Sequence, residues 1–414
     1  MENSSSALAG KVKFDPASLA AIVTEALLSG MIAFVWISLP FLSSLVSEHL
    51  YFVGILASIA IFSSLIFRIF LRFYSERGRT DLIPAMSLFI LGISLAIMYI
   101  SLTFSLMIVS MVIVGASMSL RFYGYKVNYQ QVHQLQPFGN LYSNGAAGTI
   151  GIIMILLVSA LYVGNSIRGL IGIYSIIALL VGMVSLSIRL SRKASEEFMG
   201  TKTSLVEIIK YPLSYLKSFD TLSNRRLALR ILMSLLLMYV PIAMAGAFLS
   251  SIGYVDNVSR TDIFLIFASF AVLAFLIEKS VRILNAQIIR ETFYLLRPSI
   301  LLIAMLLLSM APMSLLFVSA YALIILWIWA DSMSSGIFPK YLLDSDILKI
   351  PYMQAVFSVP LSFTAPLLGS LLWYVSPRLL FGVALAPVAI AIVLTFINPE
   401  GRFIARDSVS KNQT

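Results

Sequence analysis

The sequence predicts an all-α membrane protein with twelve transmembrane helices in two pseudo-symmetric six-helix bundles. Of its 414 residues, 59% are hydrophobic and only 12% are charged, whereas a soluble chain is roughly 45–50% apolar and about a quarter charged. The apolar residues fall into long runs separated by short polar segments. Because a bilayer crossing takes ~20 mostly apolar residues, about twelve crossings use nearly all of them.

Twelve apolar runs follow one another along the chain, and each is a candidate membrane-spanning helix. Asp15 is a good N-cap for the first run, and Pro16 suits the first helical turn. The third and fourth runs, and the ninth and tenth, are joined so closely that the sequence does not fix their boundaries. The runs occupy residues 17–41, 50–71, 82–101, 103–126, 141–163, 167–189, 231–253, 262–279, 298–312, 315–339, 351–373 and 379–397.

The positions of lysine and arginine orient the chain in the membrane. With the N-terminus inside, the outer loops contain only Arg168, Arg260 and Arg378. Cytoplasmic loops of membrane proteins carry an excess of these residue types. We therefore expect a multi-pass plasma-membrane protein with both termini in the cytoplasm. This bias also accounts for the net charge of +10, so we expect no nucleic-acid partner.

A long polar stretch divides the chain into three parts. Residues 1–190 form the predicted N-terminal six-helix bundle, and residues 231–414 form the C-terminal bundle with a short cytoplasmic tail. Between them, residues 191–230 are a cytoplasmic loop. Its apolar residues alternate with lysines over 205–219, which predicts an amphipathic helix on the inner leaflet; a plain linker is the alternative.

The two halves of the sequence share short repeated features at equivalent positions. Phe-Leu-Ser-Ser occurs at residues 41–44 and again at 248–251, at the ends of the first and seventh runs. Arg168 and Arg378, which open the sixth and twelfth runs, lie 210 positions apart. This repetition predicts a duplicated six-helix unit.

The composition excludes several kinds of chemistry. There is no cysteine, which excludes disulfides, iron–sulfur clusters and thiolate metal sites. The two histidines, His49 and His133, lie outside the apolar runs, which argues against a haem held by membrane helices. The sequence has neither the phosphate-binding loop of ATPases nor a zinc-protease motif. We expect no enzymatic activity, no metal and no cofactor.

Three ionisable residues interrupt the apolar runs: Glu25 in the first, Arg121 in the fourth and Asp331 in the tenth. A charge inside the bilayer costs a few kcal/mol, so each is a functional candidate. All three lie toward the inner ends of their runs, at depths that allow one shared cavity. We hypothesise that Glu25 or Asp331 binds and releases a proton under the influence of Arg121. The alternative is a static ion pair that holds helices together.

Polar and aromatic residues repeat around these charges at helical spacing. On the first and fourth runs they lie four and seven residues apart, and the seventh and tenth runs add aromatic rings at similar depth. The predicted proton-coupling and substrate cavity consists of Glu25, Ser29, Trp36, Ser117, Arg121, Asn128, Tyr239, Trp327 and Asp331.

The loop between the second and third runs carries a motif. It reads Leu-Arg-Phe-Tyr-Ser-Glu-Arg-Gly-Arg-Thr over residues 71–80. Gly78 and Arg79 match the pattern G-x-x-x-D-x-x-G-R-K/R, whereas Leu71, Ser75 and Thr80 depart from it. With six plus six helices, internal termini and a basic central loop, the chain resembles the major facilitator superfamily of secondary transporters over essentially its whole length.

That resemblance implies alternating access, with the first, fourth, seventh and tenth helices lining the central path. The charges of the same loop suit an inner-face gate that latches the halves in one state, although ordinary positive-inside charge explains them equally well. This predicted gating loop comprises Arg72, Glu76, Arg77, Gly78 and Arg79.

Small residues at three-residue spacing mark the fifth run. Gly145, Gly148 and Gly151 permit close helix packing. The drug/proton antiporters of the resembled family carry G-x-x-x-G-P-x-x-G-G there, but this sequence has no proline and a different spacing. Export is therefore not predicted from this motif.

We expect a secondary active transporter that moves a small solute by alternating access, driven by protons. It would act as a monomer in the lipid bilayer. The alternative is a protein of the same fold that serves as a non-transporting receptor or assembly partner. The sequence leaves substrate and direction open.

Overall fold

The computed structural model of the chain consists of helices and the short segments that connect them, in the part of the chain whose backbone it describes. It describes residues 16–46, 49–75, 82–100, 103–133, 139–164, 166–191, 225–281, 286–310, 314–334 and 349–396. Helices and short turns account for all of these residues, which confirms the predicted all-α class. The predicted amphipathic helix of the central loop lies outside the described residues.

Each predicted apolar run overlaps a helix of the structure. The first six runs correspond to α1 (Pro16–Val46), α2 (Phe52–Ser75), α3 (Ile83–Ile100), α4 (Phe104–His133), α5 (Gly139–Tyr162) and α6 (Ile167–Leu190). The last six correspond to α8 (Arg225–Ala245) with η3 (Gly246–Phe248) and α9 (Leu249–Val255), then α10 (Arg260–Val281), α11 (Ala286–Met310), α12 (Ser314–Ser334), α15 (Lys349–Val375) and α16 (Pro377–Phe396).

The seventh run is interrupted, unlike the single helix that was predicted. Pro241 lies inside α8, and the α-helix ends four residues later at Ala245. A 3₁₀ turn, η3, then leads into α9. Proline has no N–H to bond the carbonyl one turn earlier, which weakens the helix at this point. The break occurs at Gly246, a residue with low helix propensity.

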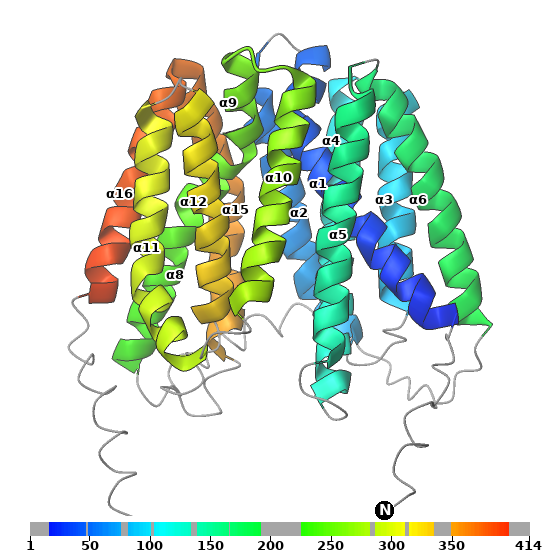
Figure 1. The fold of residues 1–414 in the computed structure, drawn as a ribbon, viewed down its shortest axis with the longest axis horizontal. Helices are drawn as coiled ribbons and strands as arrows, with labels where there is room; N and C mark the ends of the chain where they lie inside the picture. Colours follow the sequence, from blue (N-terminus) through cyan, green and yellow to red (C-terminus); the bar gives the residue numbers. More distant parts are fainter. Residues whose placement is uncertain are drawn as a thin grey trace, which may run out of the picture.

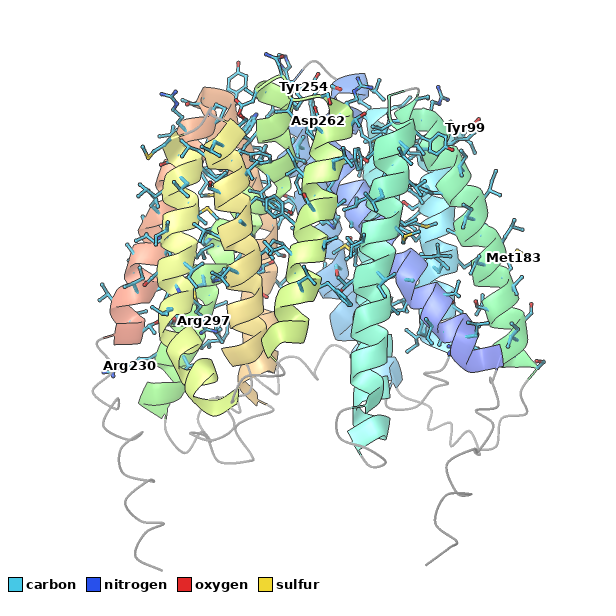
Figure 2. The ribbon with its side chains drawn as sticks, viewed as in Figure 1. Tyr99, Met183, Arg230, Tyr254, Asp262 and Arg297 are labelled. Atoms are coloured by element: carbon cyan, nitrogen blue, oxygen red, sulfur yellow. The ribbon has the colours of Figure 1, made fainter. Side chains whose placement is uncertain are left out.

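The helices suit a membrane. Seven helices in the described part of the chain are long and apolar enough to cross a bilayer, and four shorter helical segments are also apolar. Many large apolar side chains point outward; Met183 on α6, for example, projects away from the helices and is 55% exposed (Figure 2). Such surfaces are unfavourable in water but match lipid chains.

Two groups of helices share this fold (Figure 1). Helices α1–α6 pack on one another, as do α8, α9, α11, α12, α15 and α16, whereas α10 packs mainly on α5. Between the groups, α2 packs on α15 and α5 packs on α10. We call the end of the molecule at which α1 begins and α16 ends the basal end, and the opposite end, at which α1 ends and α16 begins, the distal end. The basal end is at the bottom of Figure 1.

Aromatic rings join the two groups in the distal half. The Phe41 ring of α1 stacks on Phe264 of α10 at 6.3 Å and meets Tyr254 of α9 at 5.7 Å. Phe34, two turns earlier on α1, stacks on Phe264 at 5.8 Å. The Arg260 guanidinium lies over Phe41 at 5.6 Å. We call Phe34, Phe41, Tyr254 and Phe264 the distal aromatic layer.

The structure supports the internal repetition that the sequence suggested. Helices α4 and α12 begin at residues 104 and 314, α5 and α15 at 139 and 349, and α6 and α16 at 167 and 377, each pair 210 positions apart. Hydroxyl contacts repeat with the same offset. Thr24 of α1 meets Ser185 of α6 at 3.0 Å, and Ser234 of α8 meets Thr395 of α16 at 3.2 Å.

Candidate functional site

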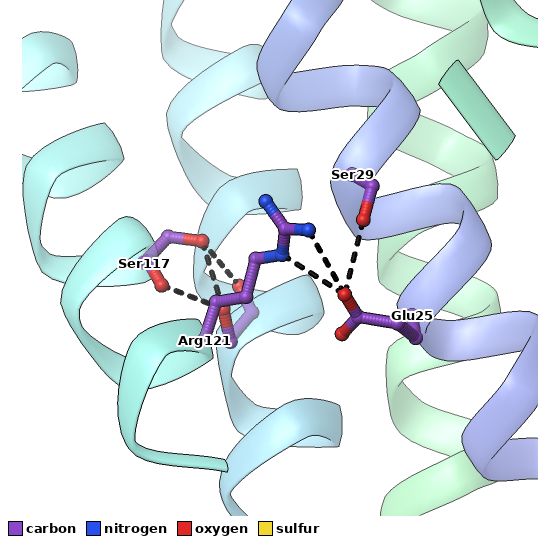
Figure 3. A network of polar contacts seen from close by, with 5 residues as sticks. Glu25, Ser29, Ser117 and Arg121 are labelled. Atoms are coloured by element: carbon purple, nitrogen blue, oxygen red, sulfur yellow. Dashed lines mark hydrogen bonds and ion pairs between the residues drawn. The ribbon is translucent and has the colours of Figure 1, made fainter. Parts of the chain in front are cut away.

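An ion pair joins α1 to α4 in the basal half of the N-terminal group (Figure 3). Both Nε and Nη2 of Arg121 donate to Oε1 of Glu25, at 3.1 and 3.0 Å. The hydroxyl of Ser29, one turn further along α1, donates to the same oxygen at 3.1 Å. The structure thus brings together three residues of the predicted cavity, and one carboxylate oxygen accepts all three hydrogen bonds.

The ion pair is only partly buried. The Glu25 side chain is 13% exposed and that of Arg121 is 33% exposed. Within the part of the chain that the structure describes, Oε2 of Glu25 and Nη1 of Arg121 have no hydrogen-bond partner. The pair therefore keeps one acceptor and one donor available for a proton, water or polar solute.

Helix α5 forms a wall of the site because it has no side chain at Gly148. A Cβ there would lie 2.9 Å from Ser29 Oγ, 3.4 Å from Glu25 Oε1 and 3.5 Å from Arg121 Nη2. One turn further on, a Cβ at Gly151 would collide with the backbone carbonyl of Ala26 on α1. These contacts confirm the close packing predicted from the glycine spacing.

Ser117 faces α3 rather than the ion pair. Its hydroxyl donates to the Ser87 carbonyl at 2.9 Å, and the Ser87 hydroxyl donates to the Ser117 carbonyl at 2.8 Å. The two hydroxyls also lie 3.1 Å apart. This reciprocal bonding fixes α4 on α3 one turn before Arg121, so Ser117 positions the arginine without touching Glu25.

The other predicted cavity residues lie on α1, α4, α8 and α12. Trp36, Tyr239 and Trp327 are partly buried and pack against the apolar core. The Trp327 indole Nε1 is buried and has no hydrogen-bond partner among the described residues. Asn128 and Asp331 lie on α4 and α12, but their side chains are outside the described residues.

The predicted gating loop also falls outside the described part of the chain. Arg72 belongs to the last turn of α2, where only the backbone is described, and residues 76–80, which contain Glu76, Arg77, Gly78 and Arg79, are not described.

Sequence reasoning missed two buried polar residues of the membrane helices. Ser87 was not recognised, because a lone serine in an apolar run gives no signal of its partner. Arg297, labelled on α11 in Figure 2, is only 1% exposed, yet it precedes the predicted run at 298–312 by one residue. The predicted run begins at residue 298, whereas α11 begins at Ala286 and therefore contains Arg297. The helix continues through Pro298, which the apolar pattern did not predict.

Comparisons with known proteins identify the fold. No protein-family model matches the chain, and no curated protein matches it by sequence. Among solved structures, tetrameric PepTSo2 is 10% identical with a TM-score of 0.66 and covers 93% of this chain and 98% of its own. The nucleoside transporter NupG is 13% identical with a TM-score of 0.61, covering 92% and 96%.

A bacterial homologue of the human lysosomal transporter Spinster, in an inward-facing and unoccupied conformation, gives a similar result. It is 11% identical with a TM-score of 0.61, and the match covers 92% of this chain and 94% of that one. At these identities the likeness concerns the fold, and it extends over nearly all of both chains. The chain has the fold of the major facilitator superfamily transporters.

Proposed function

We propose that this protein is a secondary active transporter that moves a small solute by alternating access, coupled to protons. Its twelve membrane spans would form two six-helix bundles, residues 1–190 and 231–414, joined by the loop at 191–230. It would work as a monomer in the plasma membrane with both termini in the cytoplasm. The observation that carries the proposal is the Glu25–Arg121 pair, placed inside a fold that transporters share.

The geometry of the pair supports a proton-binding role for Glu25. Three donors converge on Oε1, while Oε2 makes no hydrogen bond to a described residue and is available to accept a proton. A purely structural ion pair would be expected to bury both partners and satisfy the second oxygen too. Since Arg121 keeps an unused donor, an anionic or polar solute that binds the arginine would compete with Glu25 for the guanidinium, and this competition would couple solute binding to proton binding at Glu25.

The contacts between the two halves support access from one side. The distal aromatic layer joins α1 to α9 and α10 beyond the ion pair, while Glu25 lies in the third turn of α1, toward the basal end. The exposed part of Arg121 would then face the basal side. With the basal end as the cytoplasmic one, the structure would be an inward-open state, and transport would require the aromatic layer to separate.

The decisive experiment measures proton movement in proteoliposomes that contain a pH-sensitive dye. Nucleosides, sugars, amino acids, organic acids and cationic drugs would be added outside, and the internal pH followed. At least one class should move protons with the wild-type protein. Glu25→Gln should abolish this response while keeping the Arg121 contact, because glutamine retains an acceptor oxygen.

Asp262→Asn is the matched control, since Asp262 is an exposed carboxylate at the distal end, on α10 (Figure 2). It should leave proton movement intact. Unchanged proton movement in Glu25→Gln would remove Glu25 from the role. If a solute stabilises the wild-type protein but no solute moves protons or crosses the membrane, the non-transporting receptor becomes the better reading. Asp331 would be tested in the same way.

A further inference from the structure

A second cavity lies at the distal end of the C-terminal helices, away from the Glu25–Arg121 pair. Its volume is about 270 Å³. Four segments line it: the end of α9, the last turn of α11, the end of α15, and the start of α16. Its lining includes two charged side chains, Asp256 and Arg378, together with Ile252, Leu308, Trp373 and Phe381.

One oxygen of the carboxylate in this cavity lacks a partner among the described residues. Oδ2 of Asp256 is buried and makes no hydrogen bond in the part of the chain that the structure describes. Asp256 is the C-cap of α9, where the helix dipole disfavours a negative charge. Burial raises the pKa of this carboxyl above its ordinary value. A cation in the cavity would offset all three effects.

The other features of the cavity define the rest of the ligand. Arg378 is exposed at the rim, and guanidinium groups bind phosphate well. The floor is apolar and aromatic: Trp373 is 6% exposed and stacks on Phe248 at 4.9 Å, and Phe381 is 1% exposed. The cavity therefore combines a site for a cation, a site for an anion and an apolar surface.

Its depth fits the membrane interface. Asp256 directly follows the membrane-spanning segment that ends at Val255, and Arg378 is the second residue of the segment that begins at Pro377. Charged groups at the ends of spanning helices lie at the level of lipid headgroups. Val255, at the mouth of the cavity, is 45% exposed, so an acyl chain could leave the cavity along an apolar surface.

We propose that this cavity binds a phosphate–ammonium zwitterion, with the ammonium on Asp256 and the phosphate on Arg378. The same chemistry is presented by an ethanolamine phospholipid of the outer leaflet and by soluble phosphoethanolamine. The proposal does not depend on the transport mechanism, because the cavity and the Glu25–Arg121 pair share no residue.

The test uses the purified full-length protein, stripped of lipid in detergent, and follows its melting temperature. Phosphatidylethanolamine, phosphatidylglycerol and soluble phosphoethanolamine are titrated separately. Phosphatidylethanolamine should stabilise the wild type at lower concentration than phosphatidylglycerol, which lacks the ammonium. Asp256→Asn should need about tenfold or more phosphatidylethanolamine for the same shift, since a hydrogen bond to a charged group contributes roughly 1.5–3 kcal/mol.

Two controls separate loss of binding from loss of folding. Asp262→Asn makes the same chemical change at the same end of the protein, outside the cavity, and should bind like the wild type. Val255→Trp narrows the mouth from an exposed position and should weaken lipid binding with Asp256 intact. Stabilisation by soluble phosphoethanolamine alone would identify a solute rather than a lipid as the ligand.

Equal stabilisation of the wild type and Asp256→Asn by every compound would overturn the proposal, as would the absence of any preference for the ammonium-bearing molecules. Proton movement in proteoliposomes is measured independently, so failure of this site and failure of the transport proposal give different results.

Discussion

Replacing Gly148 with alanine tests whether the contact between α1 and α5 holds the ion pair in place. The new Cβ would lie 2.9 Å from Ser29 Oγ, well inside an ordinary van der Waals separation of ~3.5 Å. It would lie at acceptable distances, 3.4 and 3.5 Å, from Glu25 Oε1 and Arg121 Nη2. The Ser29 hydroxyl must therefore turn away, and its hydrogen bond to Glu25 is lost.

The size of the effect follows from two opposing terms. A hydrogen bond to a charged group contributes roughly 1.5–3 kcal/mol, and alanine is favoured over glycine inside a helix by up to about 1 kcal/mol. Gly148→Ala should therefore destabilise the protein by about 1–2 kcal/mol. In a Ser29→Ala background the clashing hydroxyl is absent, so the same substitution should be neutral or slightly stabilising.

Gly151→Ala is the matched comparison on the same helix face. Its Cβ would collide with the backbone of Ala26, which cannot turn away, so α1 and α5 must separate. We expect a loss of about 3 kcal/mol in either background. The assay is unfolding in detergent, followed by tryptophan fluorescence and arranged as a double-mutant cycle. If Gly148→Ala is equally harmful with and without the Ser29 hydroxyl, the steric argument for the site is wrong.

Three further predictions follow from the contacts of the site and of the distal cavity. Ser87→Ala and Ser117→Ala should each destabilise the protein by about 0.5–1.5 kcal/mol. In thermal unfolding, the double variant should lose less stability than the sum of the two single variants, because both substitutions remove the same set of hydrogen bonds. Strictly additive losses would contradict this prediction. Arg121→Gln should lower stability by about 1–3 kcal/mol, with allowance for the exposed third of the side chain. Adding Glu25→Gln should recover part of this loss in the same assay, and no recovery would mean that the pair does not couple the two side chains. Burial raises the pKa of Asp256, so the Asp256 carboxyl binds a proton more readily in the folded state than in the unfolded state. The ionised carboxylate therefore destabilises the fold, and this destabilisation should diminish as the pH falls through the raised pKa toward the ordinary pKa. Melting temperatures of Asp256→Asn across this pH range should lack that component, and an unchanged pH profile would disprove it.

Hydrophobicity alone located the helices because a bilayer span requires a long apolar run, and each predicted run overlaps a helix. The break after Pro241 was harder to predict, since proline inside a membrane helix is often tolerated: Pro40, Pro298 and Pro366 all lie within continuous helices. The outcome depends on what packs around the freed carbonyl, which the sequence does not encode locally.

The candidate site was only partly predictable for a similar reason. Depth and charge were enough to suggest that Glu25 and Arg121 meet, because opposite charges in a membrane need one another. Helical spacing put Ser117 near Arg121 but could not say that its side chain turns to α3, where Ser87 meets it. The role of Gly148 as a wall was also hidden, since it depends on how closely two helices cross.

The repeated hydroxyl contacts, Thr24 with Ser185 and Ser234 with Thr395, point to how selection has acted on each copy of an ancestral unit. These contacts tie the first helix of a unit to its sixth, and both copies retain them. The residues 210 positions after Glu25 and Arg121 are Leu235 and Asp331. The charged residues have therefore diverged between the two copies, while the hydroxyl contacts have persisted. Exchanging serine and threonine within either hydroxyl contact should be tolerated in evolution. The Glu25–Arg121 ion pair, in contrast, is a specialisation that one copy acquired or the other lost.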